Sequence, residues 1–307
     1  MPFIVKEGEA MVPNRSHNRE WWIPYAVILP ALLLIVVFKL YPIVNTVLQS
    51  FIRKGAYTLR NYELVFTDNI FAKSLWVTFK FNIIITPVQI LISIAMALLV
   101  NQQIKGIATY RSIYYLPVTI SMPVACMLWN LMLNPSTGVV NSVLNAIGIG
   151  AQPFFTGKGQ ALYSIMALAS WKGCGYWMMF ILAGLQGISS EIYESAVVDG
   201  ANWWKKTTRI TIPLLKNSLM FVIISDTTAN LLLFAPMYMI TNGGPQGSTN
   251  VLMYEAYRSA FKYTDHARAS TLLTVLLFIV ALIITVQFLT LNQDNTECQS
   301  SKGGALK

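Results

Sequence analysis

Long apolar segments separated by short polar ones constrain this chain more than any other feature. A membrane-spanning helix needs about 20 consecutive apolar residues, and six stretches of the sequence satisfy that need. Only 11% of the residues are charged, whereas 55% are hydrophobic; soluble proteins carry about 25% charged residues. The sequence therefore predicts a polytopic membrane protein. The expected spans are residues 24–51, 71–100, 113–133, 161–185, 216–240 and 270–291.

The predicted fold is all-α, a bundle of six transmembrane helices with residues 21–292 as one permease-like domain. Polar tails cover residues 1–20 and 293–307. Several expected spans contain proline, which removes a helical hydrogen bond and leaves a carbonyl unpaired. Such carbonyls are tolerated in a membrane only where protein or water covers them. The second and third spans are therefore expected to face neighbouring protein or a pathway rather than lipid on all sides.

Composition also excludes several classes of function. The net charge of +9 fits Lys and Arg anchors in the loops of a membrane protein, so nucleic acid is not an expected partner. Cys126, Cys174 and Cys298 have no ligand-like spacing, and neither a disulfide framework nor a metal site is expected. The sequence has no phosphate-binding loop of the Gly-rich Lys-Ser/Thr type. We predict no enzyme activity and no cofactor in this chain.

Residues 188–215 form a polar connection between two apolar spans, and their pattern predicts two short helices. Ser189 and Ser190 are suited to cap a helix start, with acidic residues in the first turns. Gly200 provides a stop, and Asn202 is suited to cap a second helix that carries Trp203 and Trp204. A connection built as helix, glycine and helix is stiffer than an ordinary loop.

The spacing in this connection resembles the signature loop of ATP-binding-cassette import permeases. That signature reads Glu-Ala-Ala, three residues, Gly, nine residues, Ile-x-Leu-Pro, and here Ser195 replaces the middle alanine and Ile212 the leucine. The words Ala183-Gly184-Leu185-Gln186 and Thr241-Asn242-Gly243-Gly244-Pro245 resemble its carbohydrate branch. The resemblance covers most of residues 20–292. It assigns ATPase coupling to Glu194, Ala196, Asp199, Gly200, Ile210 and Pro213.

The resemblance implies an importer that moves di- or oligosaccharides inward by alternating access. Its implied partners are a second permease subunit, two ATPase subunits that hold ATP and Mg, an extracytoplasmic sugar-binding protein and the lipid bilayer. The implied location is a bacterial cytoplasmic (inner) membrane, multi-pass, with both termini and the coupling loop in the cytoplasm. The Lys and Arg distribution favours this orientation by a small margin only. In the structural alternative, Glu194 is merely solvated at a helix start and Gly200 merely caps it.

The fourth span contains Trp171-Lys172-Gly173-Cys174-Gly175-Tyr176, which resembles the Trp-x-Gly-x-x-Tyr segment at the sugar site of the carbohydrate branch. Aromatic faces and amide or carboxylate groups are the side chains that recognise sugars. Ala229 stands where the branch has an aromatic ring, so maltose itself is in doubt. The expected substrate-binding residues are Trp171, Lys172, Gly173, Tyr176, Asp226 and Asn230.

Two charges lie deep within the predicted spans, Lys172 and Asp226. They could pair, either within the substrate site or only to fix helix packing. If Lys172 is unpaired when substrate arrives, an acidic oligosaccharide or a sugar or glycerol phosphate becomes the expected cargo. An ion-driven secondary transporter is disfavoured because Asp226 is the sole acid within a span. A third feature, the aromatic-rich stretch 242–267, is either a docking surface for the binding protein or a packed external loop.

Overall fold

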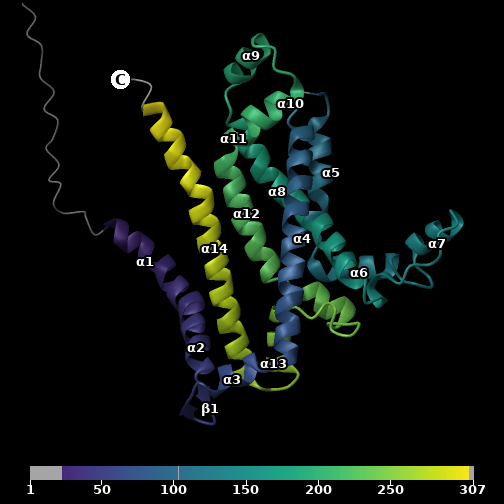
Figure 1. Cartoon of the computed structure of the whole chain (residues 1–307), viewed down its shortest axis with the longest axis vertical. Coiled ribbons are helices and arrows are strands. Elements are labelled where there is room, and N and C mark those ends of the chain that lie inside the picture. The colour runs from purple at the N-terminus through teal and green to yellow at the C-terminus, as the bar shows by residue number, and fades with distance from the viewer. Residues whose placement is uncertain (1–22, 103, 304–307) are drawn as a thin grey trace, which may run out of the picture. The chain divides into compact units, whose positions relative to one another are not determined.

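The computed structural model describes residues 23–102 and 104–303, which are mostly helical (Figure 1). The predicted tail 1–20 lies outside the described residues. The chain divides into two compact units, residues 1–48 and 49–307. In the first unit, α1 (Ile23–Ile35), the π-helical segment η1 (Val36–Leu40) and most of α2 (Tyr41–Ser50) follow one another without a break. Pro42 lacks an N–H, and just before it the Tyr41 N–H binds the Val36 carbonyl five residues back.

The second unit begins with a corner made of short elements. Strands β1 (Ile52–Arg53) and β2 (Ala56–Tyr57) form a small antiparallel hairpin, and helix α3 (Arg60–Phe66) follows. The Asn61 side chain is buried and donates hydrogen bonds to the carbonyls of Ser50 and Ile52. The buried amide therefore ties α3 to the end of α2 and to β1.

Long helices form the body of the second unit. Helix α4 (Asn69–Val100) packs against α8 (Ala161–Gln186) and α12 (Lys216–Leu231), and α12 also contacts α14 (His266–Gly303). The core side chains of α8, among them Ile165, Leu168 and Met178, are fully buried. Helix α8 matches the predicted span 161–185, whereas α14 starts before residue 270 and continues past residue 291.

Bends occur within the third predicted span and directly before the fifth. The third consists of α5 (Ile107–Thr119) and α6 (Met122–Met132), which meet at 95°. The fifth is preceded by α10 (Trp203–Lys206), η3 (Thr207–Thr211) and α11 (Ile212–Leu214), which join α12 at a bend of 71°. Helix α12 ends at Leu231 rather than near residue 240. Pro236 lacks the N–H that would bind the Leu232 carbonyl, and the chain resumes as η4 (Met237–Thr241).

Among the described residues, four helices are long and apolar enough to cross a membrane, and the number rises to six if each bent pair is one span. The remaining elements connect them. Helix α9 (Ser190–Val198) and α10 lie at one end of the second unit, whereas α3 and α13 (Leu252–Phe261) lie at the opposite end (Figure 1). Helix α7 (Val139–Ala146) and the 3₁₀ turn η2 (Phe154–Thr156) link α6 to α8.

Candidate functional site

We call residues 188–215, which contain α9, α10, η3 and α11, the α9–α10 connection. It takes its shape from hydrogen bonds within this segment. The Ser189 hydroxyl accepts the Glu191 N–H, and the Asn202 side chain accepts the Lys205 N–H at 2.9 Å. Gly200 has a φ of +71°, and the N–H of Ala201 reaches back to the Ala196 carbonyl at 2.9 Å. A glycine in this left-handed conformation is a common way to end a helix. Both predicted helix starts and the predicted glycine break are confirmed.

The six residues assigned to ATPase coupling do not share one environment. Ala196 is buried, and Ile210 is half-buried. The side chains of Glu194, Asp199 and Pro213 are exposed. A hydrogen bond of 3.2 Å between the Tyr193 and Thr211 hydroxyls ties α9 to η3. The buried residues therefore stabilise the packing of α9 against η3. The exposed ones can contact another protein surface.

Large apolar side chains are also exposed on this connection. Val198 is 87% exposed, and the Trp203 and Trp204 rings are 62% and 65% exposed. Exposed aromatic residues next to charged ones are typical of protein interfaces. The connection thus presents a surface of apolar and mixed charged character, with Glu194, Asp199, Lys205 and Arg209 exposed.

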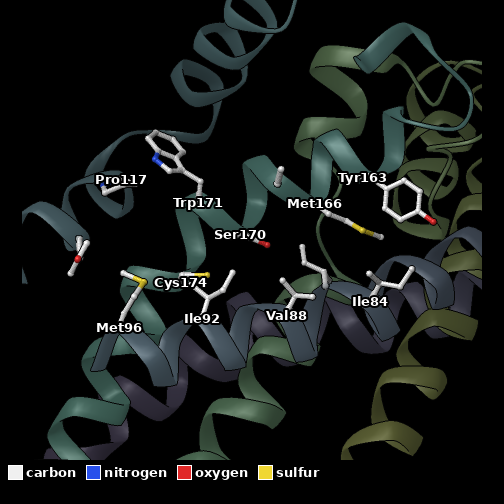
Figure 2. Close-up of a pocket in the computed structure, with 13 residues that line it drawn as sticks. Ile84, Val88, Ile92, Met96, Pro117, Tyr163, Met166, Ser170, Trp171 and Cys174 are labelled. Carbon is white, nitrogen blue, oxygen red and sulfur yellow. The ribbon is translucent and has the colours of Figure 1, made fainter. Parts of the chain in front are cut away.

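A second feature is a groove of about 620 Å³ between α4, α5 and α8. Figure 2 shows side chains of α8, among them Ser170 and Cys174, on one side and Val88 and Ile92 of α4 on the other. Trp171 lines the groove, is 37% exposed and packs against Trp129 of α6 with ring centroids 5.9 Å apart. The lining is almost entirely apolar, with an aromatic face at the rim.

Tyr176 does not join Trp171 in this groove. Its ring packs edge-on against Trp177 and Phe180, with centroids 4.8 Å and 5.0 Å away, and it is 41% exposed. Residues five apart on an α-helix point in directions roughly 140° apart. In this conformation the two aromatic residues predicted to bind sugar therefore belong to different surfaces.

Asp226, Asn230 and Gly173 come together in a buried polar cluster that joins α4, α8 and α12. The Asn230 amide donates to Gln89 Oε1 at 2.8 Å and to Thr86 Oγ1 at 3.3 Å. A Cβ on Gly173 would lie 3.1 Å from the Gln89 amide nitrogen, so a side chain there would force that amide to shift by a few tenths of an ångström. We call the set Thr86, Gln89, Gly173, Trp177, Asp226 and Asn230 the polar cluster.

The Asp226 carboxylate is the charged member of the polar cluster. It is 1% exposed and interacts with the side chains of Trp177, Thr86 and Asn230. Its Oδ2 atom has no hydrogen-bond partner. A buried acceptor without a donor is costly, so a hydroxyl or another donor that reached Oδ2 in another conformation would relieve this cost. Sequence reasoning missed Gln89 and Trp177, although a glutamine two residues after Pro87 in an apolar span was a usable signal.

Lys172 and Asp226 do not form the ion pair that the sequence left open. The Lys172 ammonium donates to the carbonyls of Ile120 at 2.6 Å and Val118 at 3.1 Å. These carbonyls lie at the break between α5 and α6, where helical partners are lost. The sequence did not predict the bend in the third span. Lys172 therefore binds the carbonyls at this bend and not the Asp226 carboxylate.

At the opposite end of the second unit, charged residues tie α13 to its neighbours. Glu255 is fully buried and accepts hydrogen bonds from Arg258, Arg268 and Asn250. Arg268 also pairs with Asp68 at 2.6 Å, at the start of α4. Breaking a buried ion pair by removing one partner is strongly destabilising. This network fixes α13 to the ends of α4 and α14.

The aromatic residues of the stretch 242–267 divide into packed and exposed members. Tyr254 is 4% exposed, and its ring stacks near Tyr257. Burial raises the pKa of the Tyr254 hydroxyl above its ordinary value. Phe261 and Tyr263 are 73% and 47% exposed. The stretch contains both the packed loop and the exposed aromatic surface that the sequence offered as alternatives.

Among the residues that the structure describes, no group of three or more His, Cys, Asp or Glu side chains could hold a metal ion. The described cysteines, Cys126 and Cys174, are free and buried in separate helices.

Residues 20–295 match the family model of the binding-protein-dependent transport system inner membrane component. The sn-glycerol-3-phosphate transport system permease protein UgpA of Brucella suis is 30% identical over 274 residues, which are 87% of this chain and 93% of that protein. The trehalose/maltose transport system permease protein MalF of Thermococcus litoralis is 29% identical over 283 residues, 90% of this chain and 95% of that protein.

The fold also has a counterpart among solved structures. A chain of a bacterial ABC transporter involved in the import of the acidic polysaccharide alginate aligns with a TM-score of 0.81 and 23% identity. The alignment covers 89% of this chain and 96% of that chain. The family match spans nearly the whole described bundle, including the α9–α10 connection and the polar cluster. The chain belongs to the family of binding-protein-dependent transport system inner membrane components.

Proposed function

We propose that this protein is the permease subunit of an ATP-binding-cassette importer that moves an uncharged di- or oligosaccharide inward by alternating access. The observation that carries the proposal is the α9–α10 connection. The N–H groups of Glu191, Ala201 and Lys205 find acceptors within the connection itself. Glu194, Val198 and the pair Trp203 and Trp204 nevertheless remain exposed. A surface that is rigid before it is covered suits a loop that transmits the movement of another subunit.

In the proposed cycle, ATP and Mg are bound by two partner ATPase subunits and not by this chain. Closure of the ATPase pair draws the coupling loops of two permease subunits together, and the helical bundles rock to expose the site to the outside. Glu194 binds a basic ATPase residue, and Gly200 sets the bend that aligns α9 with α10. Hydrolysis resets the cycle.

We further propose that both bent helix pairs cross the membrane, which gives six spans. In the proposed orientation, both termini and the α9–α10 connection lie in the cytoplasm of a bacterium and α13 lies outside. The exposed rings of Phe261 and Tyr263 next to the anchored helix α13 support this region as the docking surface for an extracytoplasmic sugar-binding protein.

The charge of the substrate follows from the two deep charged residues. Asp226 Oδ2 lacks a donor, and sugar hydroxyls are donors that a carboxylate accepts. Two of the three Lys172 donors are occupied by backbone carbonyls. The open acceptor of Asp226 in the polar cluster and the engaged ammonium of Lys172 at the break between α5 and α6 each favour neutral hydroxyl groups over phosphate or carboxylate. The second candidate, an anionic sugar or glycerol phosphate, is favoured by the names of the UgpA and alginate relatives.

Uptake into vesicles tests the proposal. The chain is copurified with the subunits that travel with it and reconstituted, and radiolabelled maltose and trehalose are compared with glycerol 3-phosphate and alginate oligosaccharides. We expect ATP-dependent uptake of a neutral sugar, stimulated by a cognate binding protein. Uptake of the anionic solutes alone would overturn the proposed substrate class. The absence of an ATPase from the purified assembly would overturn the importer.

A further inference from the structure

The bent span α5–α6 has a problem that the surrounding chain must solve. Two helices that meet at 95° cannot continue their hydrogen-bond ladder through the corner, and Pro117 and Pro123 on either side of it supply no N–H. Carbonyls left open in an apolar membrane interior cost several kcal/mol each when no donor reaches them. A donor from another helix is therefore needed at this corner.

Lys172 of α8 supplies that donor. Its Nζ atom lies 2.6 Å from the Ile120 carbonyl oxygen and 3.1 Å from that of Val118. Hydrogen bonds from a charged donor are roughly twice as strong as neutral ones. One ammonium thus binds the end of α5 and the residue that links it to α6.

Two neighbours of Lys172 on α8 contact the bent span on either side of the corner. Trp171 packs against Trp129 of α6. Gly175, one turn along, lies so close to α5 that an added Cβ would be 2.3 Å from the Tyr114 carbonyl oxygen. One turn of α8 therefore holds α6, the corner and α5.

The corner matters because α5 forms part of the groove. Tyr114 and Pro117 of α5 line it together with Trp171 and Cys174 of α8. A change in the angle between α5 and α6 moves this wall relative to Trp171. Lys172 itself does not line the groove.

We propose that Lys172 is a positioning residue that fixes the bend between α5 and α6, and with it one wall of the groove, rather than a ligand for an anionic substrate. The part of this inference that concerns transport rests on the proposed function. The part that concerns the bend does not. The two parts are therefore tested by different measurements.

The bend is tested by a distance between two spin labels. Labels at Ile113 of α5 and Leu131 of α6, which are 57% and 68% exposed, are introduced into the full chain after Cys126, Cys174 and Cys298 are replaced by alanine. The labelled protein is studied in lipid nanodiscs with its copurifying subunits. We expect one narrow distance distribution in the parent and a broad or shifted one in Lys172→Met, with the bent population reduced about tenfold or more.

Three further variants complete the distance experiment. Lys172→Arg keeps a charged donor and is expected to retain the narrow distribution, whereas Lys172→Gln, with a shorter neutral amide, is expected to fall between. Lys80→Met is the matched control, because Lys80 also lies in an apolar helix but its ammonium lies over the Tyr163 ring, 5.2 Å from the ring centroid, and the substitution should leave the distance unchanged. An unchanged distribution in both Lys172→Met and Lys172→Gln would overturn the proposal. If the Lys172→Met protein does not insert into the membrane, the distance distribution of Lys172→Gln alone decides whether the proposal holds.

Uptake separates a positioning role from a ligand role. In a positioning role, Lys172→Met lowers the uptake of every transported solute by the same factor, and Lys172→Arg restores it. In a ligand role, Lys172→Met raises KM for anionic solutes alone, which would overturn the proposal. Should the parent transport no sugar at all, the proposed function fails, and the spin-label distances still decide the role of Lys172 in the bend.

Discussion

Helix α8 and the α9–α10 connection are neighbours in sequence but obtain their structure in different ways. The buried face of α8 is packed on other helices, and its glycines allow α5 to come close at Gly175. The α9–α10 connection buries little, and its bend at Gly200 is set by hydrogen bonds within the same short segment. Contacts with other helices hold α8 in place, whereas local hydrogen bonds shape the α9–α10 connection, which in the proposed function presents its exposed residues to another subunit.

The difference is clearest at two glycines. Gly175 has no left-handed φ, but there is no space for a Cβ beside the Tyr114 carbonyl. Gly200 has open space for a Cβ, but its φ of +71° is strained for other residues. Gly175 is therefore required by close packing between helices, and Gly200 by the left-handed backbone conformation of its turn.

The largest expected effect is that of Gly175→Val. The new Cβ would meet a backbone oxygen that cannot rotate away, and overpacking costs about 1–3 kcal/mol or more. We expect loss of most folded protein, measured as the monodisperse yield after detergent extraction. Gly187→Ala, at the end of the same helix with an ordinary φ of −80°, is the control and should extract normally. Equal yields would show that α5 does not pack closely on α8.

The next effect in size is that of Glu194→Lys. The exposed carboxylate is not needed for folding, and exposed substitutions change stability by about 0.5 kcal/mol. Reversal of its charge at a coupling interface should lower uptake at least about tenfold, since mispaired charges there cost several kcal/mol. The control Glu191→Lys changes a carboxylate one turn earlier, and a loss of uptake as large in the control would remove Glu194 from its assigned role.

Asn230→Ala should have a smaller effect on stability. It removes the donor to Gln89 Oε1 and leaves that buried atom unpaired, which costs about 1–3 kcal/mol. We expect a lower thermal midpoint and reduced uptake. Thr228→Val is the control, because the Thr228 hydroxyl binds only within its own helix, at the Ile224 carbonyl. A midpoint that stays at the parent value in Asn230→Ala would contradict the polar cluster.

The smallest effect is expected for Gly200→Asn. Asparagine accepts a left-handed φ more readily than other side chains, so uptake should fall less than about twofold. Gly200→Ala should cost about 1–2 kcal/mol of loop strain and lower uptake several-fold without loss of extraction. If the two variants behave alike, the left-handed turn is not what the loop requires.

The same contrast explains what the sequence could predict. The caps at Ser189 and Asn202 and the stop at Gly200 act within a few residues, so local rules predict the α9–α10 connection. The 95° bend after Pro117 and the choice of Lys172 for its carbonyls depend on segments about 50 residues apart. Proline marked the site of disruption, but no local rule could name the donor. The sequence therefore left the Lys172–Asp226 pair open, and the structure excludes it.

The polar cluster shows the same limit. Asp226 and Asn230 were predicted from the resemblance, and they do lie together. Gln89, which binds Asn230 across a separation of 141 residues, was not. Trp171 and Tyr176 were grouped by a motif, yet helix geometry places them on different surfaces. A motif fixes residue types and spacing, and the tertiary partners decide which of them meet.

Photocrosslinking from Val198 tests the central claim most directly. This side chain is 87% exposed on the α9–α10 connection, and a photoreactive amino acid at the position would report what covers the surface. If the connection couples to an ATPase, we expect a crosslink to an ATPase subunit, with a yield that changes when ATP is added. A crosslink to an extracytoplasmic protein, or no protein crosslink in an assembly that is active in uptake, would contradict the coupling role.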